Sequence, residues 1–519
     1  MLDISTLSRT ELIAAYQRDV SRLQEKLSIQ EERIDSLENQ LKWFRTQVFG
    51  AKSERRIYDV LPKEQLALGE LLDPPEDPPS PETTVKSYER TYRTSQKLFV
   101  SDESRLRFDE SVPVETIEVP NPDLEGLLED DYQEIEERVT YRLAQRPGAY
   151  VVLKYVQRTV KKKEDKTVSR PSLPPAVIER SFADVSFLAG LIIEKFQYHL
   201  PLYRQHQRLL AAGITVDRGT LTNLVHRSAE LLEPVYYALL SSILQSDVLT
   251  MDETPIKAGR AKGKMKQSYL WPLYGDKDEI AFLFSPTRAK NVITSALSAF
   301  QGTLLTDGYA VYEKYVAEAS GITHAQCWSH TRRQFVQAEE CEPESVRLVL
   351  GLIRNLYQVE EELRESSLEE KALARSQRSA QTVDTLFSFA QKKLQEHVLL
   401  PSSPFVKACH YLLSRKEALS VFLDDPTVPI DTNHVERMIR PVAIGRKNFL
   451  FCWTEVGARS AAMLYSLISS CRLHRVDPYH YLIDVLQRID THPAINVGEL
   501  VPRIWKEKFQ QTRMTANIK

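Results

Sequence analysis

The sequence is poor in cysteine and has no long apolar run, and each shortage excludes a class of protein. All five cysteines follow residue 326, and no two of them form a CxxC pair. This spacing excludes a disulfide scaffold and indicates reduced thiols in a cytoplasm. No apolar run approaches the roughly 18 residues of a membrane-spanning helix, and residues 1–20 lack the basic start and apolar core of a signal peptide. We therefore expect a cytoplasmic protein with no membrane segment.

The sequence also lacks a large excess of charge of either sign. It contains 68 Lys and Arg residues and 71 Asp and Glu residues, which gives a formal net charge of −3. This balance excludes a uniformly basic, histone-like protein. It does not exclude DNA binding, because a large enzyme can confine its basic surface to one groove. With 519 residues, the chain is long enough for about two to four domains.

Residues 1–58 carry an apolar repeat with alternating steps of three and four residues. A repeat over about five heptads needs a partner helix to bury its seam. It predicts a coiled coil that joins the chain into a homodimer or higher oligomer. An amphipathic helix packed on its own globular domain is the alternative. One register position holds Ile13, Val20, Leu27, Ile34, Leu41 and Val48, and the other holds Tyr16, Leu23, Gln30, Leu37 and Phe44.

The next segments differ in pattern. Residues 59–85 are predicted to be a linker because they contain an acidic, proline-rich stretch. Short alternating runs in residues 86–180 predict a small β-rich domain, whose basic end at 161–163 either contacts phosphates or is solvated. Residues 181–245 are helical in pattern, and Gly213 separates two helices within them.

A helix, a glycine turn and a second helix predict a helix-turn-helix domain that reads DNA through its second helix. The alternative is an ordinary helical domain, in which short turns are common. The residues expected to contact DNA, near the leading end of the second helix, are Arg218, Thr220, Thr222, Asn223 and Arg227.

Residues 246–335 predict the first part of a catalytic core. Three strands with short connections form an antiparallel meander, and two further strands alternate with helices. This order is the ribonuclease H-like arrangement. The expected strands lie at 247–254, 267–275, 279–285, 302–307 and 323–328, and the expected helices lie at 289–300 and 308–318.

The C-terminal half is predicted to interrupt this core and then complete it. Residues 336–428 are almost wholly helical in pattern and too long for one crossover, so they predict an α-helical insertion. Residues 429–490 return to the core with a helix that starts near Asp431, and residues 491–519 form a C-terminal tail. The expected fold class is α+β and multidomain: a coiled coil, a small β-rich domain, a helical DNA-binding domain, and a ribonuclease H-like core with a helical insertion.

Three acidic residues occupy positions that suit a metal site. Asp252 falls at the end of the first core strand, and Asp307 falls at the C-terminal end of the fourth, where open α/β sheets bind ligands. Glu436 lies one turn into the late helix. Hydrolysis of a phosphodiester by in-line attack is served by two divalent ions about 4 Å apart. Because carboxylates suit Mg²⁺, with Mn²⁺ as a substitute, the trio predicts a catalytic metal site.

Several sequence motifs resemble those of one known family. The order found in the insertion-sequence-66 family of transposases is reproduced by MDETP (251–255), LTDGYAVY (305–312), CWSHTRRQF (327–335), DTNHVERMIRPVAIGRKNFLF (431–451) and AAMLYSLISSCRLHRVDPYHYLIDVLQRI (461–489). FGAKSER (49–55) and residues 199–225 extend the resemblance over most of the chain.

The resemblance implies a DDE transposase that acts on DNA in a prokaryotic cytoplasm. Its partners would be the terminal inverted repeats of its own element, target DNA and accessory proteins of the same element. The family triad falls on Asp252, Asp307 and Glu436, and the motif around the glutamate adds Asp431 and Asn433, which would orient it. The residues implied to face DNA are His330, Arg332 and Arg333, from the family's third-strand motif, and Arg437, Arg440 and Lys447 beside the glutamate.

The chain departs from the family in one respect, because members usually carry a cysteine-rich zinc-binding segment near the N-terminus. No cysteine precedes Cys327 here. We expect no zinc, since Cys327 and His330 form a single C-x-x-H pair and one pair is not a zinc site. The basic stretch 259–266 has the wrong spacing for a phosphate-binding P-loop, and it is either a hairpin loop that touches DNA or a solvated tip.

Two other functions remain open from the sequence. One is a catalytically silent, DNA-binding coiled-coil dimer, such as a repressor or a domesticated transposase. The other is a ribonuclease H-like nuclease that does not transfer strands.

Overall fold

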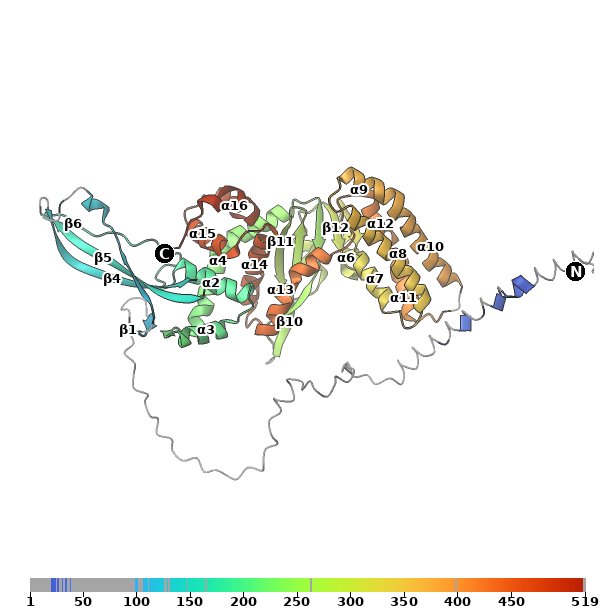
Figure 1. Ribbon diagram of the computed structural model, residues 1–519, viewed down its shortest axis with the longest axis horizontal. Coiled ribbons are helices and arrows are strands. Elements are labelled where there is room, and N and C mark those ends of the chain that lie inside the picture. The colour runs from blue at the N-terminus through green and yellow to red at the C-terminus, as the bar shows by residue number, and fades with distance from the viewer. Residues whose placement is uncertain are drawn as a thin grey trace, which may run out of the picture.

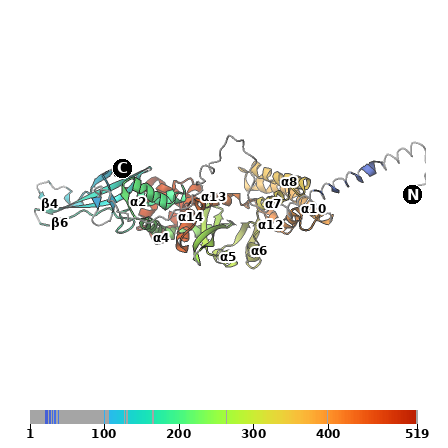
Figure 2. The same cartoon turned by 90° about the horizontal axis from the view of Figure 1, so that it is seen from below.

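The computed structural model describes residues 99–100 and 106–516, apart from gaps at 111, 126–127, 129–130, 147, 164–165, 262–263 and 397–398, and a few positions between 20 and 38. Helices and sheets both occur, which confirms the α+β class. The described part is elongated, with a β-hairpin at one end, a mixed sheet in the middle and a group of helices at the other end (Figures 1 and 2). None of its helices is long and apolar enough to cross a membrane.

Most of the predicted coiled coil and all of the predicted linker, residues 59–85, lie outside the described residues. The few described positions between 20 and 38 are helical. The coiled coil therefore stays a prediction.

A long antiparallel hairpin forms most of the segment expected to be β-rich. β4 (Tyr132–Arg146) pairs with β5 (Ala149–Lys162), while β3 (Val114–Glu118) runs parallel to β5 and β6 (Val168–Ser169) pairs with its end. Since β5 lies between other strands, most of its side chains are buried, whereas residues 133–138 on the outer strand are exposed. The hairpin projects away from the helices that follow it (Figure 1).

Three helices connect the hairpin to the central sheet: α2 (Val185–Phe196), α3 (Leu202–Ala211) and α4 (Arg218–Ile243). The side chain of Asp184 begins α2 by accepting a hydrogen bond from the Ser186 N–H at 2.9 Å, as an N-cap residue does.

The connection between α3 and α4 differs from a short helix-turn-helix turn. Gly213 has a φ of 78°, a conformation that glycine adopts without steric cost. The chain then forms β7 (Ile214–Thr215), which pairs with β2 (Arg107–Phe108) before α4 begins. The sequence pattern did not predict this strand, because two residues are too few to show an alternation.

The central sheet has the strand order β11-β10-β8-β12-β13. β8, β10 and β11 are antiparallel neighbours, and β12 and β13 run parallel to β8, in agreement with the predicted meander and crossovers. The crossover helices α5 and α6 lie together beside the sheet (Figure 2). The elements are β8 (Val248–Met251), β10 (Lys264–Gly275), β11 (Glu279–Ser285), α5 (Lys290–Ala296), β12 (Gly302–Thr306), α6 (Ala310–Val316) and β13 (Ile322–Gln326).

One strand of this sheet was missed. β9 (Thr254–Ala261) follows β8 directly and pairs with the first half of β10, so β8 does not continue to residue 254. The described residues of the expected basic loop at 259–266 are therefore strand residues. The glycines and lysines of this stretch obscured its β character, because both residue types are depleted in strands.

A group of helices follows β13. Its helices pack around a separate apolar core that includes Trp328, Ile353 and Phe405. The expected third-strand residues His330, Arg332 and Arg333 lie on α7 instead of a strand, since β13 ends at Gln326. α7 (Trp328–Val336) precedes the segment expected to be the insertion. The helices of that segment are α8 (Pro343–Glu362), α9 (Leu368–Ala374), α10 (Ala380–Gln395), α11 (Pro404–Leu413) and α12 (Lys416–Asp424), with a π-helical turn at Arg375–Ser379.

The chain returns to the sheet through α13 (Asn433–Phe449) and α14 (Glu455–Leu473). Ser466 and Ser470 on α14 accept hydrogen bonds from backbone N–H groups of β11, at 2.8 and 3.1 Å. The helix thus covers the outer edge of the sheet, which would otherwise present unpaired N–H groups.

The segment expected to be a C-terminal tail is folded. After α15 (Pro478–Arg488), it forms α16 (Pro502–Lys508) and buries Trp505, which is 1% exposed. The indole N–H of Trp505 donates to the buried Asp484 at 2.6 Å. A single apolar anchor in a polar stretch gives little sequence periodicity, which explains why no helix was expected here.

Candidate functional site

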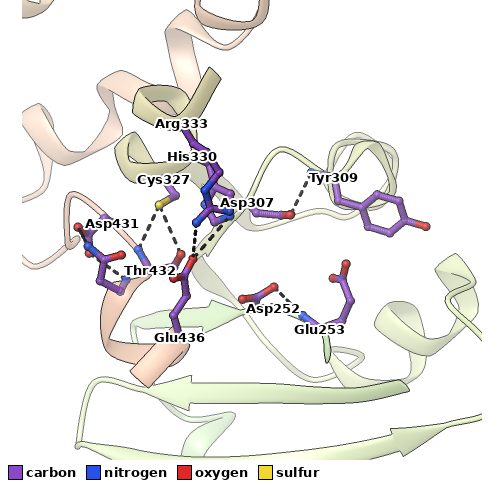
Figure 3. A network of polar contacts seen from close by, with 11 residues as sticks. Asp252, Glu253, Asp307, Tyr309, Cys327, His330, Arg333, Asp431, Thr432 and Glu436 are labelled. Carbon is purple, nitrogen blue, oxygen red and sulfur yellow. Dashed lines mark hydrogen bonds and ion pairs between the residues drawn. The ribbon is translucent and has the colours of Figure 1, made fainter. Parts of the chain in front are cut away.

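Three carboxylates meet where two neighbouring parallel strands end. Asp252 and Glu253 follow β8, and Asp307 follows β12. One oxygen from each residue lies within 4.8 Å of the others (Figure 3). Among the described residues this is the group of carboxylate, imidazole or thiolate side chains that is close enough to hold a metal ion.

The two aspartates are held by local hydrogen bonds. Asp252 Oδ1 accepts the Glu253 N–H at 2.7 Å, and Asp307 Oδ1 accepts the Tyr309 N–H at 2.9 Å. Gly308 lies between the partners of the second bond, and an added Cβ there would overlap the Tyr411 hydroxyl. The loop after β12 therefore requires a residue without a side chain beside Asp307.

The electrostatics of the site oppose ionisation of Asp252. Burial, together with the charges of Glu253, Asp307 and Glu436, raises the pKa of Asp252 to about 7. Burial and the charge of Asp307 also raise the pKa of Glu253, although Arg288 and Tyr312 offset part of this effect. Carboxylates with raised pKa values that share a site are typical of functional positions, where a cation or a proton compensates the charge.

Glu253 was missed by the sequence analysis. Its side chain is 5% exposed and forms an ion pair with Arg288, while the Tyr312 hydroxyl donates to Glu253 Oε2 at 3.0 Å. The Arg288 guanidinium stacks over the ring of Tyr309, 3.8 Å from its centroid. Asp252 was chosen for its position at the end of the first strand, and adjacent residues of a strand would point to opposite faces. The strand ends at Met251, and the alternation does not hold beyond it.

Glu436 faces this group from α13 and contacts α7. Glu436 Oε1 lies 3.3 Å from Arg333 Nη2 and 3.8 Å from His330 Nε2 (Figure 3). Glu436 is not among the three carboxylates that lie within 4.8 Å of one another, but its charge contributes to the raised pKa of Asp252. The structure thus brings all three predicted carboxylates, together with His330 and Arg333, to one place.

The start of α13 is fixed to the end of β13 and to β8. Cys327 Sγ accepts hydrogen bonds from the Thr432 N–H and hydroxyl, at 3.3 and 3.4 Å. Thr432 is the N-cap residue, and the Asp431 side chain accepts from the Asn433 N–H at 2.9 Å. His434 Nε2 and Thr250 Oγ1 share a hydrogen bond of 3.2 Å, although they lie 184 positions apart in the sequence. These bonds set the position of Glu436, which follows one turn later.

Cys327 is a structural thiol in this arrangement. Burial raises its pKa to about 11, so the sulfur is protonated at neutral pH and acts as a hydrogen-bond acceptor for Thr432. The Cys327 side chain is buried.

The predicted DNA-contact residues fall into two groups. Arg437, Arg440 and Lys447 are exposed on α13 beside Glu436, and Arg332 is exposed on α7. The other group lies on α4, where the neighbouring His226 contacts α14 through its Nδ1 and Ser460 Oγ at 3.0 Å. In this second group Arg218, Thr222, Asn223 and Arg227 are exposed, and Thr220 is half-buried.

Comparison with known proteins gives the family. A model described as "Transposase IS66 family" matches residues 180–460, and one described as "IS66 C-terminal element" matches residues 466–502. The chain belongs to the IS66 transposase family.

Relatives of this IS66 family member occur in Sinorhizobium fredii (strain NBRC 101917 / NGR234). "Uncharacterized protein y4hP" is 28% identical over 516 residues, which cover 93% of this chain and 91% of the relative. "Uncharacterized protein y4jD" is 34% identical over 359 residues, or 65% of this chain and 69% of the relative. The first similarity spans the hairpin, the sheet and the insertion together.

Proposed function

We propose that this IS66 family member is a DDE transposase that binds the terminal inverted repeats of an insertion sequence and catalyses metal-dependent strand cleavage and strand transfer. The observation that carries the proposal is the meeting of Asp252, Asp307 and Glu436 from two parallel strand ends and a facing helix. Membership of a transposase family supports it independently.

The proposed catalytic core is ribonuclease H-like. It would comprise β8 to β13 with their crossover helices and α13, interrupted by the insertion from α8 to α12. Supporting this assignment is the strand order, in which an antiparallel meander is extended by two parallel strands. The carboxylates then lie at the C-terminal ends of the parallel strands, where open sheets bind ligands.

The donor set fits divalent ions that prefer oxygen. Asp252, Glu253 and Asp307 offer carboxylate oxygens within 4.8 Å, and their mutual repulsion favours a bound cation. We propose Mg²⁺, with Mn²⁺ as a substitute, held by Asp252, Asp307 and Glu436. When bound, two such ions would activate the attacking oxygen and stabilise the departing one.

The protein's own residues would orient the substrate and the glutamate. Arg333 holds the Glu436 carboxylate from α7, so that it faces the two aspartates. Arg437, Arg440 and Lys447 are exposed on the same helix and would bind phosphates on either side of the scissile bond. We further propose that α4 contacts the terminal repeat, and that the N-terminal helix joins two copies so that both element ends are held.

The test is cleavage and joining of DNA that carries the element ends. Asp252→Ala and Glu436→Gln should each reduce strand cleavage and transfer to background while end binding in EDTA remains within about twofold of the unsubstituted protein. Glu340→Gln, an exposed glutamate on the insertion side of α7, serves as the matched control and should retain activity. Full strand transfer by either site variant would refute the assignment.

The same assay distinguishes the proposed transposase from the alternative, a catalytically silent DNA-binding dimer. That protein would bind the ends with unchanged affinity in every variant and would cut in none of them, with or without Mg²⁺. A nuclease without strand transfer would cut but would leave the target DNA unjoined.

A further inference from the structure

An exposed aromatic side chain lies just beyond the C-terminal end of α13. Trp453 is 58% exposed, although Phe451 packs against its ring with 5.4 Å between centroids. The guanidinium of Arg260, from β9, lies over the indole at 3.8 Å from its centroid. An indole and a stacked guanidinium present a flat, cationic surface to solvent.

This pair is held in place by the backbone. The Cys452 N–H donates to the Lys257 carbonyl at 2.9 Å, and the Gly259 N–H donates to the Cys452 carbonyl at 3.2 Å. The two bonds form a parallel bridge between Ala258 and Cys452, which joins the end of α13 to β9. Trp453 is therefore positioned by the sheet and does not hang from a free loop.

The turn into this segment is strained. Leu450 ends α13 with a φ of 62°, in the left-handed region where glycine is the usual residue, and its side chain is 63% exposed. A leucine in that conformation carries a steric cost with no burial to offset it. Such outliers cluster at binding sites, where the strain serves a function.

The surroundings are basic. Lys257 and Lys264 are exposed on β9 and β10. The acidic residue of this region, Glu455, lies 3.6 Å from Lys266, so its charge is already compensated. A surface of stacked aromatic and basic side chains suits nucleic acid better than an acidic or purely apolar protein partner.

The same helix connects this surface to Glu436. Glu436, Arg440, Ile444 and Lys447 are spaced three or four residues apart and therefore share one face of α13. From Glu436 to Lys447 the helix rises by about 16 Å. At the duplex spacing of about 3.4 Å per nucleotide of one strand, the rise from Glu436 to Lys447 alone corresponds to roughly five nucleotides. Trp453 follows the end of the helix, so it lies apart from the bond that is cut.

We propose that Trp453 and Arg260 form a stacking platform for an unpaired nucleobase of the substrate DNA, several nucleotides from the bond that is cut. This inference rests on the proposed function, because it identifies the DNA as locally unpaired near the site. Stacking on an aromatic ring tolerates any base. The platform would therefore bind a base because it is unpaired, whatever the DNA sequence.

The test compares two labelled DNA probes bound by the full chain in EDTA, where no strand is cut. One probe is an intact duplex of about 30 base pairs, and the other is the same duplex with a central gap of about five nucleotides. Fluorescence anisotropy gives both affinities, and 2-aminopurine in the gap reports stacking. We expect the protein to prefer the gapped probe and Trp453→Ala to lose about tenfold in affinity for it, with the intact duplex changed by less than about twofold.

Matched variants define the outcome. Trp453→Phe keeps a ring and should retain most of the preference, whereas Tyr198→Ala, a similarly exposed aromatic between α2 and α3, should change nothing. Equal binding of both probes by the unsubstituted chain, or an unchanged preference in Trp453→Ala, would overturn the platform while leaving the proposed function intact. If Trp453→Ala instead alters the oligomeric state and leaves the preference unchanged, the surface is a protein interface and the inference is wrong. Failure to bind either probe would refute the proposed function as well.

Discussion

Replacing Asp252 by asparagine is expected to stabilise the metal-free protein while removing a carboxylate from the site. Asparagine has nearly the same shape, and its carbonyl oxygen can still accept the Glu253 N–H that Asp252 Oδ1 accepts at 2.7 Å. What the substitution removes is a charge that is buried beside Glu253, Asp307 and Glu436.

The size of the effect follows from the pKa of Asp252, which is raised from its ordinary value of 3.8 to about 7. A carboxyl group of this kind contributes its full stability below the unfolded pKa and loses it as the pH rises through the folded pKa. At about 1.4 kcal/mol per pH unit, the free energy of unfolding falls, relative to low pH, by at most about 4 kcal/mol above pH 7. At pH 5 it falls by about 1.5 kcal/mol, because Asp252 is then ionised in the unfolded chain but protonated in the folded one. The asparagine variant should therefore gain about 2.5 kcal/mol relative to the unsubstituted chain between pH 5 and pH 8.

Urea denaturation in EDTA at both pH values measures this difference. Asp490→Asn, which changes an exposed aspartate outside the site, is the control and should show no such gain. Added Mg²⁺ at pH 8 should stabilise the unsubstituted chain more than the Asp252→Asn variant, because a bound ion compensates the carboxylates that are present. A variant whose stability follows the same pH curve as the unsubstituted chain would show that Asp252 is not held at a raised pKa.

Three further predictions concern residues around the site. Glu253→Gln should raise the Mg²⁺ concentration for half-maximal cleavage by about tenfold, measured by metal titration, and an unchanged requirement would exclude a role for this carboxylate at the metal. Arg375→Met should lower the free energy of unfolding, measured in urea, by about 3–5 kcal/mol, because it leaves the partly buried Glu360 and three backbone carbonyls without their hydrogen-bond donor. A loss below about 1 kcal/mol would contradict this. Gly445→Ala should cost about 1–3 kcal/mol, since the new methyl group would overlap the Tyr465 hydroxyl, whereas Gly351→Ala on α8 meets no atom within 4 Å and should be tolerated.

The strands of the sheet were predictable because their apolar runs are short, continuous and separated by clear turns. β11 and β12 show this pattern, and the structure places both within a residue or two of the expected bounds. β9 was not predictable in the same way, because GRAKG offers glycines and lysines where a strand usually carries β-branched residues. Its pairing with β10 supplies the stability that its own sequence lacks.

The site was partly predictable for a related reason. Asp252 and Asp307 each follow an apolar strand, so topology alone selects them from the many acidic residues of the chain. Glu253 and the contact of Arg333 with Glu436 depend on where side chains point after an element ends, and no periodicity records that. The position of α13 depends on long-range bonds such as that of Thr432 to Cys327, which local patterns do not contain.

The hydrogen bond between His434 and Thr250 can form only late in synthesis, because both partners must have left the ribosome. Its partners lie 184 positions apart, so at a synthesis rate of about 5–20 residues per second roughly 10–40 s pass between the emergence of β8 and that of α13. Late in this interval the growing chain already contains Asp252, Glu253 and Asp307, but it still lacks Glu436. A chain that ends within the insertion would contain Asp252, Glu253, Asp307 and α4, but it would never receive the Glu436 that faces them.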